Sequence, residues 1–404
     1  LQPVRPRLRL QGMRLRGAAL AVIIPALVSA LLTVMTSGCA AAQPARAAAG
    51  LTASHATSGP GGSPHGRAAV PWSHVGPGWV LTQYASAPPE GGSGPAALYL
   101  ISPGGTRYQL ASWPSWRSAP QLVAWSPDGQ RALFQVVTGR GGAEQLTLAS
   151  GQVSRFGLPG GASVIGYTTP RGLNIVAGQP DGDGTSLARY TLSGRLARSL
   201  GYSADGQILY QPSGAGFVTG TSNGLELAGN AGGLIRRLPV PGASANSCNP
   251  ARWWDSATVL ASCAPAGRAA SQLWLVPVSG ARPRPLTPPR AASSRDLGDL
   301  DAWSLASGLY LQSAGPCGVL QIFRQAQAGA ITLVSVPHTM GDNHVLTVDG
   351  SRMLVQAPTS CTGSVSLLWF NPATRAEQWL IRAPASATGA AIAIPFYSRE
   401  NGNL

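Results

Sequence analysis

The chain has 404 residues, of which 44% are hydrophobic and only 11% charged, with a formal net charge of +14. This composition excludes a chain that is disordered throughout. Every one of the 29 basic residues is arginine, and the longest basic run is the pair Arg236 and Arg237. Because dense basic patches are what nucleic-acid binding requires, we expect no nucleic-acid partner.

Residues 1–39 have the pattern of an export signal. A basic, acid-free segment precedes the apolar run 17–35, and Thr36-Ser37-Gly38-Cys39 follows. The last four residues resemble a bacterial lipobox, so Cys39 is the expected site of lipidation. Two alternatives remain: cleavage at a later small-residue site at Ala40–Ala42, which releases the protein, or retention of the 19-residue apolar run as a membrane anchor. All three place the rest of the chain outside the cytoplasm, anchored to the outer face of the cytoplasmic membrane or secreted.

Residues 40–68 are rich in Ala, Gly, Ser and Pro and show no apolar periodicity. We expect a disordered tether, whose 29 residues would span about 30 Å on average.

A phrase that recurs about every 43 residues organises the region 69–384, and its clearest copy is LVAWSPDGQRALFQ (122–135). An apolar run with an aromatic residue leads to a Ser-Pro-Asp-Gly turn, and a second apolar run follows. Seven copies are anchored on Trp72, Trp125, Tyr167, Tyr210, Trp253, Trp303 and the apolar substitute Leu346. Each copy ends in a further hairpin phrase such as LTLASGQVSRFGL (146–158). The pattern predicts an all-β, seven-bladed β-propeller of four-stranded antiparallel blades; the alternative, a pair of β-sandwiches, needs no fixed period.

The C-terminal segment 385–404 contains a second apolar stretch, AIAIPFY. It follows a seventh blade that is already complete by pattern. We expect it either to close the ring by pairing with the first blade or to form an added edge.

Four cysteines remain when Cys39 is assigned to the lipobox, an even number that favours disulfides in an exported protein. Loops between second and third strands lie on the same propeller face as the loops that lead into each blade. Cys248, Cys263, Cys317 and Cys361 all fall in such loops, which predicts the pairs Cys248–Cys263 and Cys317–Cys361. Free thiols or a metal cluster are disfavoured because no C-x-x-C occurs.

The same face carries the long connections, whereas the opposite face carries only tight turns. Long loops on a rigid scaffold are the usual place for ligand binding. The candidate ligand-binding residues are Arg140, Asp181, Asp183, Arg268, Arg295, Asp296, Asp299 and Asp301. Neither a catalytic motif nor a cofactor or metal signature stands out: GTSNG (220–224) reads as a hairpin turn, and DGDG (181–184) lacks the rest of a calcium loop.

The repeat AWSPDGQRALF resembles that of TolB-like, WD40-like propellers over residues 70–384. With its basic signal and lipobox-like cysteine, the chain resembles actinobacterial propeller lipoproteins of the broad kind that includes LpqB-type proteins. The resemblance implies envelope protein interactions without catalysis; TolB's separate N-terminal domain has no counterpart in 40–68, so a Tol-Pal role is not carried over. Two hypotheses follow: a monomeric, membrane-tethered module that binds a protein, peptide or glycan, and, as the alternative, an exported propeller enzyme or carbohydrate-processing protein with a site in the long-loop funnel.

Overall fold

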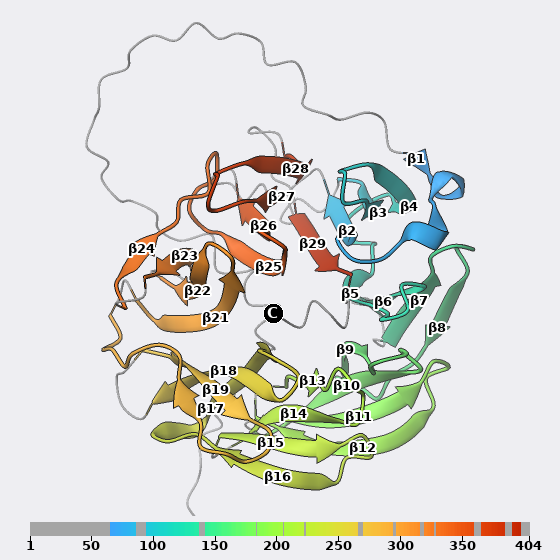
Figure 1. Cartoon of the computed structure of the whole chain (residues 1–404). Helices are drawn as coiled ribbons and strands as arrows, with labels where there is room; N and C mark the ends of the chain where they lie inside the picture. Colours follow the sequence, from blue (N-terminus) through green and yellow to red (C-terminus); the bar gives the residue numbers. More distant parts are fainter. Residues whose placement is uncertain are drawn as a thin grey trace, which may run out of the picture. The chain divides into compact units, whose positions relative to one another are not determined.

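The computed structural model describes residues 65–85, 94–136, 142–182, 184–204, 206–221, 224–265, 270–293, 296–315, 319–326, 329–358, 365–383 and 390–396. These residues form seven β-sheets arranged around a common axis (Figure 1). The helices among them are two three-residue 3-10 turns, η1 (Arg67–Ala69) and η2 (Trp72–His74). The expected fold class, an all-β seven-bladed propeller with four-stranded antiparallel blades, is confirmed.

Six blades are each built from four consecutive strands, with the first strand innermost and the fourth outermost. Blade 2 comprises β5 (Gln121–Trp125), β6 (Arg131–Val136), β7 (Gly142–Thr147) and β8 (Val153–Phe156). Blade 3 comprises β9 (Ser163–Tyr167), β10 (Asn174–Asp181), β11 (Gly184–Thr191) and β12 (Leu196–Ser203). Blade 4 comprises β13 (Leu209–Tyr210), β14 (Gly216–Thr221), β15 (Gly224–Gly229) and β16 (Leu234–Pro239).

The remaining consecutive blades follow the same order. Blade 5 comprises β17 (Ala243–Trp253), β18 (Thr258–Pro265), β19 (Gln272–Pro277) and β20 (Arg284–Pro285). Blade 6 comprises β21 (Gly298–Leu305), β22 (Gly308–Ala314), β23 (Leu320–Gln325) and β24 (Ile331–Leu333). Blade 7 comprises β25 (His344–Asp349), β26 (Arg352–Pro358), β27 (Val365–Phe370) and β28 (Glu377–Ile381).

Blade 1 joins the two ends of the described chain. Its sheet has the order β1-β4-β3-β2-β29, with β1 (His65–Gly66), β2 (Val80–Ala85), β3 (Ala96–Ile101), β4 (Arg107–Trp113) and β29 (Ala390–Pro395). The innermost strand β29 pairs antiparallel with β2 over its whole length, from Val80 opposite Pro395 to Ala85 opposite Ala390. The C-terminal stretch therefore closes the ring, and the propeller extends beyond 69–384 at both ends.

The repeat copy anchored on Trp72 does not supply the inner strand that the sequence pattern predicts. Trp72 lies in η2 and packs, partly buried, against the core of blades 1 and 2. The innermost strand of this blade is β29, and the ring of Phe396, directly after it, meets the Trp125 ring edge-on at 5.1 Å. The repeat count was right because the missing inner strand is supplied from the other end of the chain, which a linear period does not reveal.

The Ser-Pro-Asp-Gly turn shows why the repeat phrase bends where it does. The Asp128 carboxylate accepts hydrogen bonds from the Ser126 hydroxyl (2.5 Å) and the Gln130 backbone N–H (3.1 Å). Gly129 has φ of 73°, and a Cβ there would lie 2.8 Å from the Phe396 ring. Glycine thus serves both the left-handed backbone and the close approach of the closing segment.

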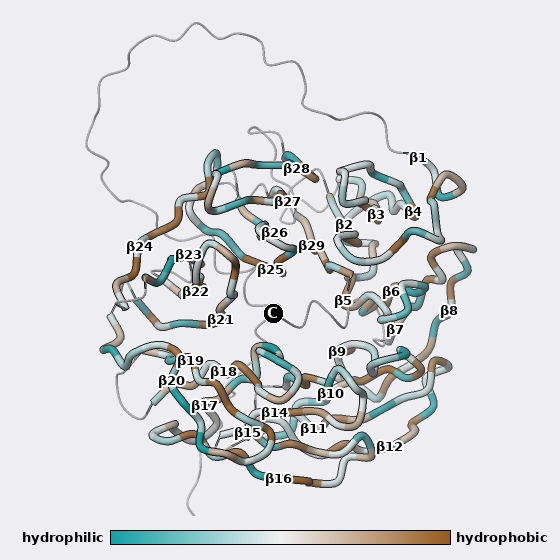
Figure 2. The backbone as a smooth tube through the Cα atoms, viewed as in Figure 1, coloured by the Kyte–Doolittle hydropathy of each residue, from teal (hydrophilic) through white to brown (hydrophobic). Residues whose placement is uncertain are grey.

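Apolar side chains fill the space between neighbouring blades. Trp303 from blade 6 shares a buried cluster with Val345, Met353 and Phe370 of blade 7. Figure 2 shows the corresponding apolar segments running along the strands. Because each sheet is covered on both faces by its neighbours, removal of any blade would expose two apolar faces.

Polar side chains near the end of second strands connect one blade to the next. They bond to backbone groups at the start of the following blade's inner strand, at 2.6–2.8 Å: Gln83 with Pro120 and Leu122, Gln135 with Val164, Ser262 with Asp299, and Gln312 with Asn343. Buried backbone groups are satisfied this way. These bonds fix the segments that lead into the inner strands.

The part of the chain that the structure describes holds no long apolar helix of the kind that crosses a membrane. The apolar run 17–35 and Cys39 lie outside it.

Removal of β29 should destabilise the propeller strongly. A chain that ends at Gly389 loses the inner strand of blade 1 and exposes the apolar faces that Ile392 and Ile394 cover. We expect the thermal midpoint to fall by roughly 10 °C or more, since loss of several kcal/mol shifts a domain of this size by that much. Calorimetry measures it, and a chain that ends at Phe396 is the matched control. Equal midpoints for the two truncated chains would contradict the closure.

Candidate functional site

A disulfide marks the end of the blades where the long connections lie. Cys248 on β17 stands opposite Cys263 on β18, and their sulfurs are bonded. Both residues are only 1% exposed. This is one of the two expected pairs; Cys317 and Cys361, the other pair, lie outside the described residues.

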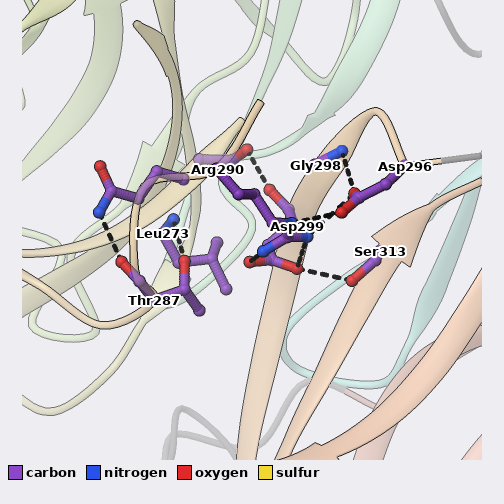
Figure 3. Close-up of polar contacts among 9 residues, drawn as sticks. Leu273, Thr287, Arg290, Asp296, Gly298, Asp299 and Ser313 are labelled. Atoms are coloured by element: carbon purple, nitrogen blue, oxygen red, sulfur yellow. Dashed lines mark hydrogen bonds and ion pairs between the residues drawn. The ribbon is translucent and has the colours of Figure 1, made fainter. Parts of the chain in front are cut away.

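Three of the expected ligand-binding residues come together where the chain enters β21. Asp296, Asp299 and Asp301 lie within six residues, and two arginines from other segments face them. The arrangement is a set of charge pairs rather than a group of free acids. Figure 3 shows the part of it formed by Arg290, Asp296 and Asp299.

The guanidinium of Arg290 binds the carboxylates of both Asp296 and Asp299. Its Nε and Nη2 donate to Asp296 at 2.5 and 3.1 Å, and its Nη1 and Nη2 donate to Asp299 at 2.6 and 2.7 Å. The side chains of Arg290 and Asp296 are 23% and 33% exposed, whereas that of Asp299 is 1% exposed. Bidentate pairs of this kind fix orientation as well as charge.

The Asp299 carboxylate has a further donor and a fixed backbone. The Ser313 hydroxyl donates to its Oδ1 at 2.6 Å, and the Ser262 hydroxyl donates to its backbone carbonyl at 2.7 Å. The hydrogen bond to Asp299, with that to Asp296, raises the pKa of Arg290 despite its partial burial. The guanidinium is therefore permanently charged, as the buried carboxylate requires.

The segment before Arg290 is also held in place. The Thr287 carbonyl accepts from the Gln272 amide at 2.5 Å, and its hydroxyl accepts from the Leu273 N–H at 3.0 Å. The Ala270 N–H donates to the Arg290 carbonyl at 2.9 Å. Blade 5 thus positions the arginine that neutralises the acids of blade 6.

Asp301 has its own arginine. The Nε and Nη2 atoms of Arg252 donate to its two oxygens at 2.8 and 2.9 Å. The Arg252 guanidinium also lies 4.3 Å above the ring of Trp303. This pair is a second bridge between blades 5 and 6, and the aromatic face supplements the carboxylate.

Two further titratable groups lie at the adjoining start of β25. The Asp342 carboxylate accepts from the Leu320 N–H at 2.7 Å, and burial raises its pKa. The protein atoms around the imidazole lower the pKa of His344, although the negative charges of Asp301 and Asp342 oppose the shift and the residue is exposed at the start of β25.

The other expected residues are not brought to this cluster. Asp181 ends β10 in blade 3, where its carboxylate accepts from the Ser186 hydroxyl at 2.5 Å. Arg140, Asp183, Arg268 and Arg295 lie outside the described residues. Within the described ranges no three His, Cys, Asp or Glu side chains converge to hold a metal ion.

The sequence did not single out Arg252, Arg290, Asp342 or His344. Arg290 and Arg295 flank the same loop, and no pattern distinguishes the one that binds the acids. Arg252 and Asp301 are 49 residues apart, so only the fold reveals their pairing.

No protein-family model and no curated protein matches the chain. Solved structures are similar at low identity. TolB from Acinetobacter baumannii is 13% identical with a TM-score of 0.44, and the match covers 78% of this chain and 66% of that one. A puromycin-hydrolyzing peptidase of Mycobacterium tuberculosis is 15% identical with a TM-score of 0.48, covering 76% and 52%. A putative 6-phosphogluconolactonase from Bacteroides uniformis is 14% identical with a TM-score of 0.49, covering 78% and 99%.

The chain thus spans about half the length of the peptidase and 66% of TolB. At these identities the likeness concerns the fold alone.

Replacement of Arg290 by methionine should cost far more stability than a matched surface change. Arg290→Met leaves the buried Asp299 carboxylate without its counter-charge, which costs about 3 kcal/mol or more. Arg282→Met removes an exposed arginine that forms no ion pair with the described residues and should change stability by less than about 0.5 kcal/mol. Denaturant unfolding measures both. Similar losses in the free energy of unfolding for the two variants would show that the pairing of Arg290 with Asp296 and Asp299 does not stabilise the fold.

Proposed function

We propose that this chain is a non-enzymatic binding module of the cell envelope, held at the membrane through Cys39 and presenting its long-loop face to a protein, peptide or glycan. The observation that supports it best is the pairing of all three acids before and within β21 with arginines. Such a surface offers fixed, oriented charges and hydrogen-bonding groups.

The pairing argues against acid–base chemistry at these residues. A general acid or base exchanges its proton at the working pH and must reach the substrate. The Asp299 side chain is 1% exposed and accepts from two arginine nitrogens and a serine hydroxyl. Asp296 and Arg290 are partly exposed, so these two side chains are the part of the cluster that a ligand can reach.

Export supports the same proposal. The N-terminal pattern predicts it, and a buried cystine between Cys248 and Cys263 is typical of proteins that fold outside the cytoplasm. Cys39 is placed just ahead of a tether-like segment, so the lipid would hold the propeller near a membrane.

One observation favours the alternative, an exported enzyme. Asp342 and His344 are two residues apart, and the pKa of the Asp342 carboxyl is raised whereas that of the His344 imidazole is lowered from its ordinary value. Neighbouring groups of this kind occur in acid–base sites. A hydrolytic or carbohydrate-processing site would be centred on these two residues.

Site-specific photo-crosslinking tests the proposed binding face. A photoreactive residue at Asp296 of the full chain, in intact cells, should capture a defined partner. The same residue at Arg171, which is exposed in the turn between β9 and β10 on the tight-turn face, should not. Equal capture from both positions would defeat the face assignment.

The enzyme alternative has its own test. The purified chain is incubated with envelope peptides and glycans, beside Asp342→Asn and Arg171→Asn variants. Turnover that Asp342→Asn abolishes and Arg171→Asn retains would overturn the non-enzymatic proposal.

A further inference from the structure

The outer rim of blades 2–5 differs in charge from that of blades 6 and 7. Its outermost strands β8, β12, β16 and β20, called here the basic rim, contain no acidic residue. They contribute Arg155, Arg198, Arg236, Arg237 and Arg284. By contrast, β24 of blade 6 has no charged residue and β28 of blade 7 begins with Glu377. The basic rim therefore lies on consecutive blades, and it adjoins β4 of blade 1, which carries Arg107 and no acidic residue.

Large apolar side chains are exposed between these arginines. They are Val153 (45% exposed), Leu196 (60%), Tyr202 (44%), Leu234 (53%) and Ile235 (57%). Figures 1 and 2 place their strands next to one another along one arc of the ring. Single exposed apolar residues are ordinary, but a run of them over adjoining strands marks an interaction surface.

The positive charge of the basic rim is available to a partner. Arg198 and Arg284 form no ion pair with the residues that the structure describes. Arg155 and Arg237 pair with Glu144 and Glu226 of the adjoining third strands, yet their side chains remain 77% and 78% exposed. A partner for this surface should be negative and partly apolar.

The chain also enters the propeller at the rim. Strand β1 pairs in parallel with β4, the fourth strand of blade 1, through Tyr108 and Gln109. The Arg67 guanidinium donates to the Leu110 carbonyl of the same strand. Blade 1 adjoins blade 2, with which it shares a buried cluster. The first described residues, His65 and Gly66, therefore lie at the circumference of blade 1, which adjoins the first blade of the basic rim.

We propose that the basic rim lies against the anionic phospholipid surface of the membrane to which the chain is attached, an inference that rests on the attachment proposed above. Arginines bind lipid phosphates through charge-assisted hydrogen bonds, and tyrosine and aliphatic side chains enter the interfacial region. Docking by the rim stands the propeller on its edge, so the long-loop face stays open to a partner. The spread of charge over four blades favours an extended surface over a single acidic peptide.

Hydrogen exchange of the full chain in lipid nanodiscs tests this docking. One disc contains phosphatidylcholine alone and the other includes phosphatidylglycerol. We expect slower exchange in β12 and β16 in the anionic disc only, reversed by high salt. Strand β28, on the other side of the ring, is the internal reference and should exchange equally in both.

Matched double variants separate the basic rim from total charge. Arg198→Asn with Arg284→Asn should lower the docked-to-free ratio by roughly 30-fold, the effect of two charges near an anionic surface. Arg171→Asn with Arg375→Asn removes the same charge from tight turns and should leave the ratio unchanged. Thermal unfolding checks that both variants are folded.

Each outcome is decisive. If the full chain enters neither disc, the attachment fails, and the docking with it. If it enters both and β12 and β16 exchange equally, docking alone is overturned. Protection that rises with protein concentration, without regard to lipid, would assign the edge to a second copy of the chain.

Discussion

The antiparallel pairing of β2 with β29 is the constraint on which the rest of the structure depends. A ring of sheets without it would expose the inner edge of blade 1 and the faces of blades 1 and 7. The pairing joins residues more than 300 positions apart, as the bond from the Thr82 hydroxyl to the Ile392 carbonyl shows. Phe396, directly after β29, packs edge-on against Trp125 of blade 2, so ring closure also fixes the interface between blades 1 and 2.

Contacts between blades turn this ring into a rigid platform for the long-loop face. Side chains on the second strand of one blade bond to the start of the inner strand of the next blade, as Ser262 does to Asp299. Between blades 5 and 6, ion pairs of Arg252 and Arg290 add to this hydrogen bond. The Asp299 carboxylate can be buried because Arg290 supplies its counter-charge. The guanidinium donates two hydrogen bonds to Asp299 and two to Asp296. Fixed polar groups at the mouth of a rigid ring suit recognition better than proton transfer.

Much of the fold could be predicted from the sequence because it depends on local chemistry. The turn at Asp128 and Gly129 and the repeat of about 43 residues determine the hairpins and the blade count. The source of the first inner strand could not be read, since Trp72 keeps the spacing of the repeat while β29 supplies the strand. The recurring glutamines at 83, 135 and 312 were a signal in the sequence. The pairing of Arg252 with Asp301 was not, because it depends on how two blades face each other.

Native-state hydrogen exchange of β29 tests the central claim most directly. If this strand closes the ring, its amides exchange only through global unfolding, with the same free energy as those of β21 in blade 6. Matching values, lowered together by denaturant, are the predicted result. Exchange of β29 near the rate of an unstructured peptide, while β21 stays protected, would show that the ends of the chain do not hold the propeller together.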